Sequence, residues 1–147
     1  MTTLPERADI VIIGGGIVGC SVAYHLTKLG LNDVVLFERK QLTCGTTWHA
    51  AGLVGQLRAS KNMTRLAQYS TELFANLAAE TGQETGYQPT GSMTLALNAE
   101  RLEELKRQAT MANAFDVACE LVGPDFVQER WPGIDTSDVH GGVYLPG

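Results

Sequence analysis

A glycine-rich turn between two apolar runs constrains the fold of this chain more than any other feature. The run Ile10–Ile13 contains only β-branched residues, which is typical of a strand buried on both faces. It leads into the turn Gly14–Gly19, a helix-like segment that ends near Gly30, and a second apolar run, Val34–Phe37. This order of strand, turn, helix and strand predicts a βαβ unit of a parallel sheet.

The spacing of the glycines fits a turn that binds a dinucleotide. Gly14 allows a sharp turn, Gly16 lets the backbone approach a pyrophosphate, and Gly19 lets the helix pack closely against the sheet. The N–H groups that begin this helix have no intrahelical partners and attract phosphate. Glu38 follows Gly19 by 19 residues, near the spacing of about 20 expected for an acid that binds ribose hydroxyls. Its charge disfavours NADP but does not distinguish NAD from FAD.

Composition and charge exclude several classes of function. The chain has 147 residues, of which 44% are hydrophobic and 18% charged, so it can form a packed core. A net charge of −5 without a basic cluster argues against nucleic acid or an anionic membrane as a partner. Three scattered cysteines without a C-x-x-C pair argue against disulfides and against a zinc or other metal site. The first apolar run is too short to span a membrane, and the residues around it resemble no signal or transit peptide, so we expect a cytoplasmic location.

Beyond Glu38 the pattern first predicts a loop and then alternating helices and strands. Helices are expected over 62–80, after the N-cap Asn98 and over 124–130, and strands over 92–97, 120–122 and 142–145. The character of the sequence changes near Gly82. We therefore expect residues 1–83 to be part of a nucleotide-binding domain and residues 84–147 to begin an inserted α+β substrate domain. Because only two parallel strands are clear, we also expect the chain to be the N-terminal part of a larger protein.

The loop 39–55 holds Trp48 and His49 among small residues. Loops that follow the carboxyl end of a parallel strand are where such folds bind ligands. A single loop histidine is more often an exposed or hydrogen-bonded residue than a functional one. Spacing alone therefore leaves the role of His49 open.

The segment Thr46–Leu53 (TTWHAAGL), together with the glycine turn and Glu38, resembles the flavoprotein family of sarcosine and dimethylglycine dehydrogenases. This family lies within the class of D-amino-acid-oxidase-like FAD enzymes. The resemblance covers nearly the whole chain and continues through Glu80–Gly82, Thr90–Ser92, Glu103–Lys106 and Gly142–Pro146. It implies an α/β, Rossmann-like FAD-binding fold. The residues that it implies for cofactor binding are Gly14, Gly16, Ile17, Val18, Gly19, Glu38, Arg39, Thr46, Thr47, His49, Ala50 and Gly52.

The resemblance also implies roles for single residues. The three motif glycines would line the FAD pyrophosphate, and Glu38 would hold the adenosine ribose. His49 would bond covalently to the 8α-methyl carbon of the flavin, a bond for which a neutral imidazole nitrogen is a suitable nucleophile. Arg58 follows the flavin loop closely enough to pair with a substrate carboxylate, although a surface arginine is the commoner case. His25 and His140 match no such role.

The implied activity is oxidative demethylation of an N-methylated glycine, either sarcosine or dimethylglycine. The N-methyl carbon would lose hydride to the flavin, and the resulting imine would hydrolyse to formaldehyde and the demethylated amine. A tetrahydrofolate-binding module further along the protein, and an electron-transfer flavoprotein or oxygen as the acceptor, are further expectations. Two alternatives stay open: a related amine or hydroxy-acid oxidase or dehydrogenase with non-covalent FAD, and a nucleotide-binding or regulatory module without catalysis.

Overall fold

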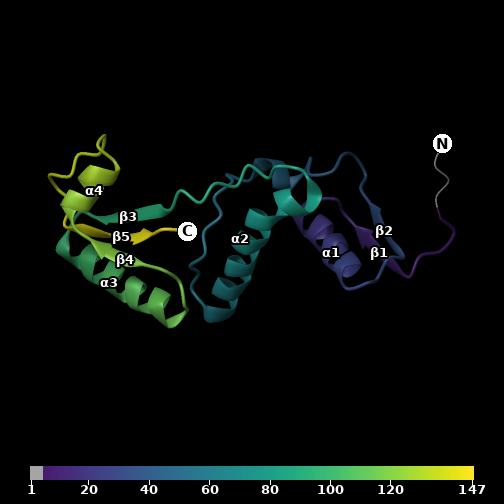
Figure 1. Ribbon diagram of the computed structural model, residues 1–147, viewed down its shortest axis with the longest axis horizontal. Coiled ribbons are helices and arrows are strands. Elements are labelled where there is room, and N and C mark those ends of the chain that lie inside the picture. Colours follow the sequence, from purple (N-terminus) through teal and green to yellow (C-terminus); the bar gives the residue numbers. More distant parts are fainter. Residues whose placement is uncertain (1–4) are drawn as a thin grey trace. The chain divides into compact units, whose positions relative to one another are not determined.

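The computed structural model describes residues 5–147 and divides the chain into two compact units, Met1–Leu53 and Val54–Gly147. The expected domain boundary after residue 83 concerns a longer protein and stays a prediction. Figure 1 traces the elements along the chain. Among the described residues, no helix combines the length and apolar character needed to cross a membrane.

The first unit contains the βαβ arrangement that the sequence predicts. Strand β1 (Ile10–Ile13) is followed by helix α1 (Ile17–Lys28) and strand β2 (Val34–Phe37). The two strands pair in parallel, with Ile10 opposite Val34 and Ile13 opposite Phe37. A 3-10 turn, η1 (Thr46–His49), lies within the segment expected to be a loop. The predicted order and bounds of both strands are confirmed.

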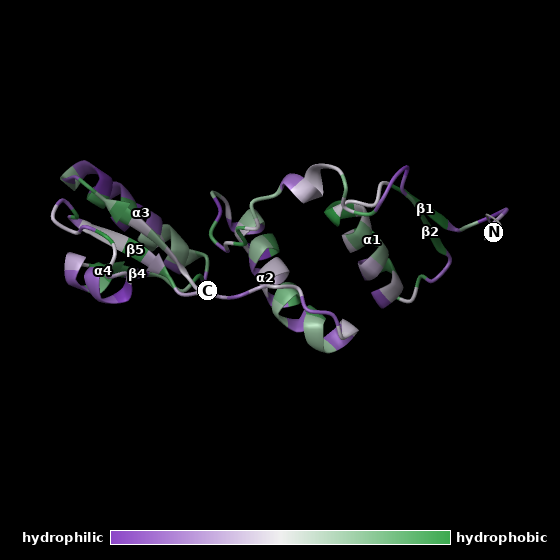
Figure 2. Cartoon of the chain, turned by 90° about the horizontal axis from the view of Figure 1, so that it is seen from above, coloured by the Kyte–Doolittle hydropathy of each residue, from purple (hydrophilic) through white to green (hydrophobic). Residues whose placement is uncertain are grey.

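The expected burial of β1 on both faces is wrong for two of its residues. Ile13 is 89% exposed and Val11 is 54% exposed, while their neighbours in the strand are half-buried. The unit provides two strands and one helix, so α1 covers one side of the sheet and no described element of the unit covers the other. Figure 2 shows the apolar character of β1 and β2.

The second unit begins with a long helix, α2 (Lys61–Thr81). Ser60 caps its N-terminus by accepting a hydrogen bond from the Met63 N–H. Gly82 ends it with a φ of 73°, a left-handed conformation that glycine adopts at little cost. The helix agrees with the predicted span of 62–80 to within one residue at each end.

A three-stranded antiparallel sheet forms the rest of this unit, with strand order β3-β5-β4. Its strands are β3 (Ser92–Ala96), β4 (Glu120–Val122) and β5 (Gly141–Leu145), and its helices are α3 (Ala99–Ala114) and α4 (Pro124–Arg130). Asn98 caps α3 by accepting a bond of 2.8 Å from the Arg101 N–H. In both views α3 and α4 lie on opposite sides of the sheet (Figures 1 and 2).

The central strand β5 is buried on both faces. Its side chains alternate between the two faces of the sheet, and each set packs against a different helix region. Val143 and Leu145 pack into a core with residues of β3 and α3, among them Ala96 and Leu105. Tyr144 points to the other face, where its ring contacts the rings of Phe126 and Trp131, with centroids 5.5 and 6.0 Å apart. The sheet is therefore covered by α3 on one side and by the α4 region on the other.

Candidate functional site

The glycine turn connects β1 to α1 through two close backbone approaches. Gly14 has a φ of 105°, which only glycine adopts without strain, and its N–H donates to the Phe37 carbonyl at 2.8 Å. A Cβ at Gly19 would collide with the carbonyl oxygen of Gly14 and would lie 3.4 Å from the Ile12 side chain. The glycine at position 19 therefore lets α1 begin directly against the strand, as its place in the motif predicts.

Glu38 is held at the turn by backbone donors. One carboxylate oxygen accepts from the Gly15 N–H at 2.8 Å, and the other accepts from the Lys40 N–H at 3.0 Å. The hydrogen bond from Gly15, followed by that from Lys40, lowers the pKa of Glu38 below its ordinary value of 4.5. A carboxylate has about four acceptor positions, so two stay available for the vicinal hydroxyls of a ribose. The geometry thus fits the role that the sequence assigns to Glu38.

Thr47 brings the loop after β2 onto the start of α1. Its hydroxyl oxygen accepts from the Ile17 N–H at 3.0 Å, and a Cβ on Gly16 would lie 3.1 Å from the same oxygen. Within α1, the backbone N–H of Cys20 donates to the Gly16 carbonyl at 3.0 Å, so helix geometry leaves the N–H groups of Val18 and Gly19 without intrahelical acceptors. Such N–H groups, with the helix dipole, suit a phosphate oxygen. The backbone of Gly14–Gly19 with Glu38 and Thr47, called the cradle below, fits the pyrophosphate that FAD shares with other dinucleotides.

His49 is the last residue of η1, two residues beyond Thr47, and its side chain is exposed. Since consecutive Cα atoms are about 3.8 Å apart, its Cα lies within about 8 Å of that of Thr47. Trp48 beside it is 78% exposed. The imidazole is therefore an exposed side chain of the same loop that caps α1, and its role in holding a cofactor stays a prediction.

The remaining predicted cofactor residues lie around these groups. Thr46 begins η1, and Ala50 ends it by donating its N–H to the Thr47 carbonyl at 3.2 Å. Arg39 follows Glu38 and is exposed, and Gly52 is in the left-handed region with a φ of 75°. Of these four residues, Ala50 bonds the Thr47 backbone, and the backbone N–H of Arg39 helps to lower the pKa of Glu38.

Two residues of the cradle were missed by the sequence analysis. Gly15 is buried, holds Glu38 through its N–H and accepts from the Thr43 N–H at 2.8 Å through its carbonyl. A Cβ there would meet the Leu42 side chain at 2.5 Å. Thr43 itself has a φ of 65°. The run of three consecutive glycines, with Gly15 in the middle, was the available signal for position 15, whereas nothing in the local sequence marks Thr43.

Arg58 belongs to the second unit and lies in the segment that precedes α2. Its side chain is exposed, and its Nη1 donates to the Leu57 carbonyl at 2.9 Å. It lines an open hollow of about 630 Å³ with Arg101 and Arg107 of α3, and Arg101 pairs with Glu104 at 2.6 Å. An excess of guanidinium groups around this hollow suits a carboxylate.

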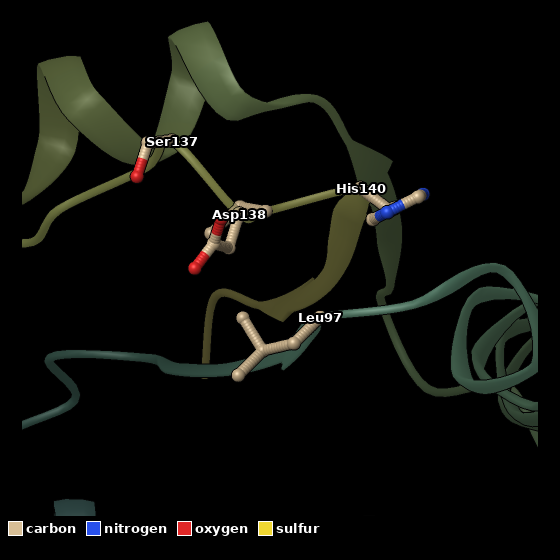
Figure 3. Close-up of a pocket in the computed structure, with 5 residues that line it drawn as sticks. Leu97, Ser137, Asp138 and His140 are labelled. Atoms are coloured by element: carbon tan, nitrogen blue, oxygen red, sulfur yellow. The ribbon is translucent and has the colours of Figure 1, made fainter.

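A second hollow of the second unit contains serine, aspartate and histidine side chains but no catalytic arrangement. It is lined by Leu97, Ser137, Asp138, Val139 and His140. Figure 3 shows the ring of His140 pointing away from Ser137 and Asp138. The described hydrogen bond of His140 is made by its backbone N–H, which donates to the Ala96 carbonyl at 2.8 Å. A nucleophile–base pair, which needs contact at about 2.6–3.2 Å, is not present among these residues.

His25 has local partners, as expected for a residue without a cofactor role. Its Nδ1 lies 2.6 Å from the Ser21 carbonyl oxygen and 3.3 Å from the Ser21 hydroxyl. Within residues 5–147, no three histidine, cysteine, aspartate or glutamate side chains gather closely enough to hold a metal ion.

The chain is similar in sequence to known proteins over nearly its whole length. The chain is 42% identical to rat dimethylglycine dehydrogenase over 142 residues, covering 97% of this chain and 17% of the relative. It is 40% identical to human sarcosine dehydrogenase, covering 97% and 16%. It is also 42% identical to the mouse pyruvate dehydrogenase phosphatase regulatory subunit, covering 97% and 16%. The chain thus spans about one sixth of the length of these relatives.

A solved structure confirms the fold class. The crystal structure of L-proline dehydrogenase from P. horikoshii matches 97% of this chain and 37% of its own chain, with a TM-score of 0.88 and 31% identity. The parallel β1–β2 pair with α1 is part of this shared Rossmann-like fold. The predicted α/β fold of an FAD-dependent oxidoreductase is therefore confirmed.

The expected cytoplasmic location is wrong by comparison with the relatives. The dimethylglycine and sarcosine dehydrogenases that match the chain are mitochondrial proteins by name. The expectation depended on the residues around the first apolar run, which resemble no signal or transit peptide, and the names of the relatives overturn it.

Sequence, geometry and comparison now converge on one family. The family model described as "FAD dependent oxidoreductase" matches residues 9–147, from the start of β1 through β5. The chain belongs to this FAD-dependent oxidoreductase (DAO) family.

Proposed function

We propose that the full-length protein is an FAD-dependent dehydrogenase that demethylates an N-methylated glycine. The proposal is supported by identities of 40–42% to sarcosine and dimethylglycine dehydrogenases over nearly the whole chain. The observation that carries it is the cradle in which Glu38 and Thr47 both bond the glycine turn, while His49 ends η1 in the same loop as Thr47. A dinucleotide cofactor is long enough to need binding groups at its pyrophosphate and ribose and again at its ring system.

In this proposal each residue of the cradle has one task. The N–H groups of Val18 and Gly19 bind a pyrophosphate oxygen, and the hydroxyl of Thr47, whose oxygen already accepts from Ile17, has its hydrogen free to donate to another. Glu38 binds the ribose hydroxyls through its two unused acceptor positions. Bound FAD would supply the redox chemistry by accepting a hydride from the N-methyl carbon.

His49 is proposed to bond covalently to the 8α-methyl carbon of the flavin. A neutral imidazole nitrogen with an exposed ring is accessible for such a bond. After acid precipitation of the full-length protein, the yellow colour should stay with the protein pellet. In the His49→Ala variant any flavin should move to the supernatant, whereas His140→Ala, which changes another exposed histidine, should behave as the unmodified protein does.

Arg58 is proposed to bind the carboxylate of the substrate. Its guanidinium has five N–H donors, of which one is directed at the Leu57 carbonyl. Further parts of the proposal are a tetrahydrofolate-binding module elsewhere in the longer protein and an electron-transfer flavoprotein as electron acceptor. These two follow from the resemblance alone.

The test is anaerobic reduction of the full-length holoprotein by candidate amines. Sarcosine or dimethylglycine should bleach the flavin and yield formaldehyde, and dimethylamine, which lacks the carboxylate, should react far more slowly. Reaction with another amine or hydroxy acid, with flavin that acid releases, would instead support a related oxidase with non-covalent FAD.

A second candidate function is supported by one specific relative. The mouse pyruvate dehydrogenase phosphatase regulatory subunit is as similar to this chain as the dehydrogenases are. The same cradle would then hold a nucleotide without catalysis. A full-length protein that binds FAD but is bleached by none of the amines would favour this function.

A further inference from the structure

Thr64 is a buried residue whose hydroxyl makes two hydrogen bonds to the backbone of one residue outside its helix. It lies in the first turn of α2 and has 0% of its surface exposed. Its hydroxyl oxygen accepts from the Arg58 N–H at 3.1 Å, and its hydroxyl hydrogen donates to the Arg58 carbonyl at 3.2 Å. One side chain therefore binds both polar groups of the backbone of Arg58.

Thr71, in the same helix, shows how a buried threonine can be satisfied locally. It is 5% exposed, and its hydroxyl donates to the Gln68 carbonyl at 2.8 Å, within α2 itself. Threonine side chains in helices commonly donate to the carbonyl three or four residues earlier. The hydroxyl of Thr64 instead bonds a residue outside the helix, so its contacts fix the segment that precedes α2.

The backbone of Arg58 is held, but its guanidinium is not enclosed. The side chain is exposed and lines the hollow it shares with Arg101 and Arg107. The segment between Arg58 and α2 is fixed again by Ser60, whose carbonyl accepts from the Thr64 N–H at 2.9 Å. The exposed side chain of Arg58 thus extends from a backbone that Thr64 holds in place. Because the backbone is already ordered, less conformational entropy is lost when the guanidinium binds an anion.

We propose that Thr64 is a positioning residue that fixes Arg58 for binding of a substrate carboxylate. The inference rests on the proposed function in that Arg58 is the residue that receives this carboxylate. Thr64 touches neither the substrate nor the cofactor and acts through the backbone of Arg58 alone. A misplacement of about 1 Å in a positioned group is enough to change rates and affinities by up to about 100-fold.

The experiment uses the full-length holoprotein and the variant Thr64→Val, which keeps the shape of the side chain but removes the hydroxyl. KM for dimethylglycine or sarcosine should rise about tenfold, and kcat should change less than twofold, because the carboxylate is bound equally in the ground and transition states. Thr64→Ser should restore the original KM. Thr71→Val, which removes a buried hydroxyl bonded within the helix, should leave KM unchanged.

A double-mutant cycle, with acetate as a carboxylate probe, distinguishes a positioning role of Thr64 from a purely structural one. Acetate binding is read from the change in the flavin absorption spectrum, which requires no turnover. Thr64→Val should weaken acetate binding about tenfold in the unmodified protein and have no further effect in an Arg58→Gln background. If Thr64→Val fails to fold, Thr64→Cys, with its weaker donor, replaces it in the cycle.

Three results would overturn the inference: unchanged acetate binding in Thr64→Val, an equal loss in the Arg58→Gln background, or a failure of Thr64→Ser to restore binding. The proposed function can fail separately. If no N-methylated glycine reduces the flavin, yet acetate binding shows the predicted coupling, then the positioning role stands while the identity of the substrate is wrong.

Discussion

The two units of this chain are stabilised by different kinds of contact. Among described residues, all the buried hydrophobic side chains belong to Val54–Gly147, where α3 and α4 enclose β5. In Met1–Leu53 large apolar side chains such as Ile13 and Val18 are exposed, and the βαβ geometry is fixed by backbone and polar hydrogen bonds around the glycine turn. The binding motif is therefore formed locally, while its hydrophobic burial is incomplete within its own unit.

The cradle can therefore be fixed by hydrogen bonds around the glycine turn even though one face of the β1–β2 sheet is exposed in this unit. The cradle depends on backbone atoms of the glycine turn and on two side chains, Glu38 and Thr47. The second unit depends instead on side-chain packing around Leu105 and Val143, which are 0% exposed. Substitutions should therefore affect the two units in different ways.

The largest effect is expected in the core of the second unit. Leu105→Ala should lower the free energy of unfolding by about 2–5 kcal/mol, because it removes a fully buried side chain from between α3 and the sheet. Val18→Ala, at a residue 73% exposed, should change it by less than about 0.5 kcal/mol. Urea unfolding of the 147-residue chain measures both values. Equal losses would show that the first unit has a core of its own.

The next effect is expected at the closest backbone approach of the cradle. Gly19→Ala should cost about 1–3 kcal/mol, because its Cβ would collide with the Gly14 carbonyl and displace α1. The flavin content of the full-length protein should fall as well. Gly45→Ala is the matched control, since no atom lies within 4 Å of a Cβ there and its φ is −90°. A Gly19→Ala protein with normal flavin content would contradict the described cradle.

A smaller loss of stability is expected from Thr64→Val. It leaves the N–H and carbonyl of Arg58 without their partner, which should cost about 1–2 kcal/mol. The measurement is the free energy of unfolding of the 147-residue chain. Thr64→Ser should recover most of the loss, and no difference between valine and serine would mean that the hydroxyl bonds contribute nothing.

The smallest effect concerns pH and compares one carboxylate in each unit. The pKa of Glu38 is lowered mainly by the Gly15 N–H, and that of Glu103 mainly by its hydrogen bond with Lys106. A lowered pKa in the folded state stabilises the protein above pH 4.5, and this contribution is lost as the pH falls below 4.5 through the folded-state pKa. Both Glu38→Gln and Glu103→Gln should therefore weaken the acid dependence of unfolding.

Salt distinguishes these two carboxylates. The Glu103–Lys106 pair is an exposed ion pair, so its effect should largely disappear at about 1 M salt. The bond from Gly15 to Glu38 involves a neutral backbone donor and should persist. Acid titrations of the two variants at low and high salt measure this, and loss of both effects in high salt would show that Glu38 is stabilised by charge.

Most of the fold could be predicted because its signals are local. The β-branched run, the N-cap Asn98 and the terminating Gly82 fix element bounds through neighbouring residues. Burial was harder to predict. Ile13 has the sequence of a buried strand but is 89% exposed, since burial depends on which elements pack against it.

The candidate site was predictable where a residue type has one role at a fixed spacing. Glu38 and the motif glycines were predicted in this way, and the structure brings them together at one turn. The bond between Ile17 and Thr47 spans 30 residues, and the two bonds between Arg58 and Thr64 depend on how a loop returns to a helix. Neither is encoded in a periodic pattern, so the capping by Thr47 and the anchoring by Thr64 became visible only in three dimensions.

The central claim is that the glycine cradle and His49 hold one flavin nucleotide. Its most direct test is mass spectrometry of the proteolysed full-length holoprotein, searching for the peptide that contains Trp48 and His49. We expect this peptide to carry the mass and visible absorption of the flavin nucleotide, bonded to the imidazole. An unmodified His49 peptide from a protein that retains its yellow colour would contradict it.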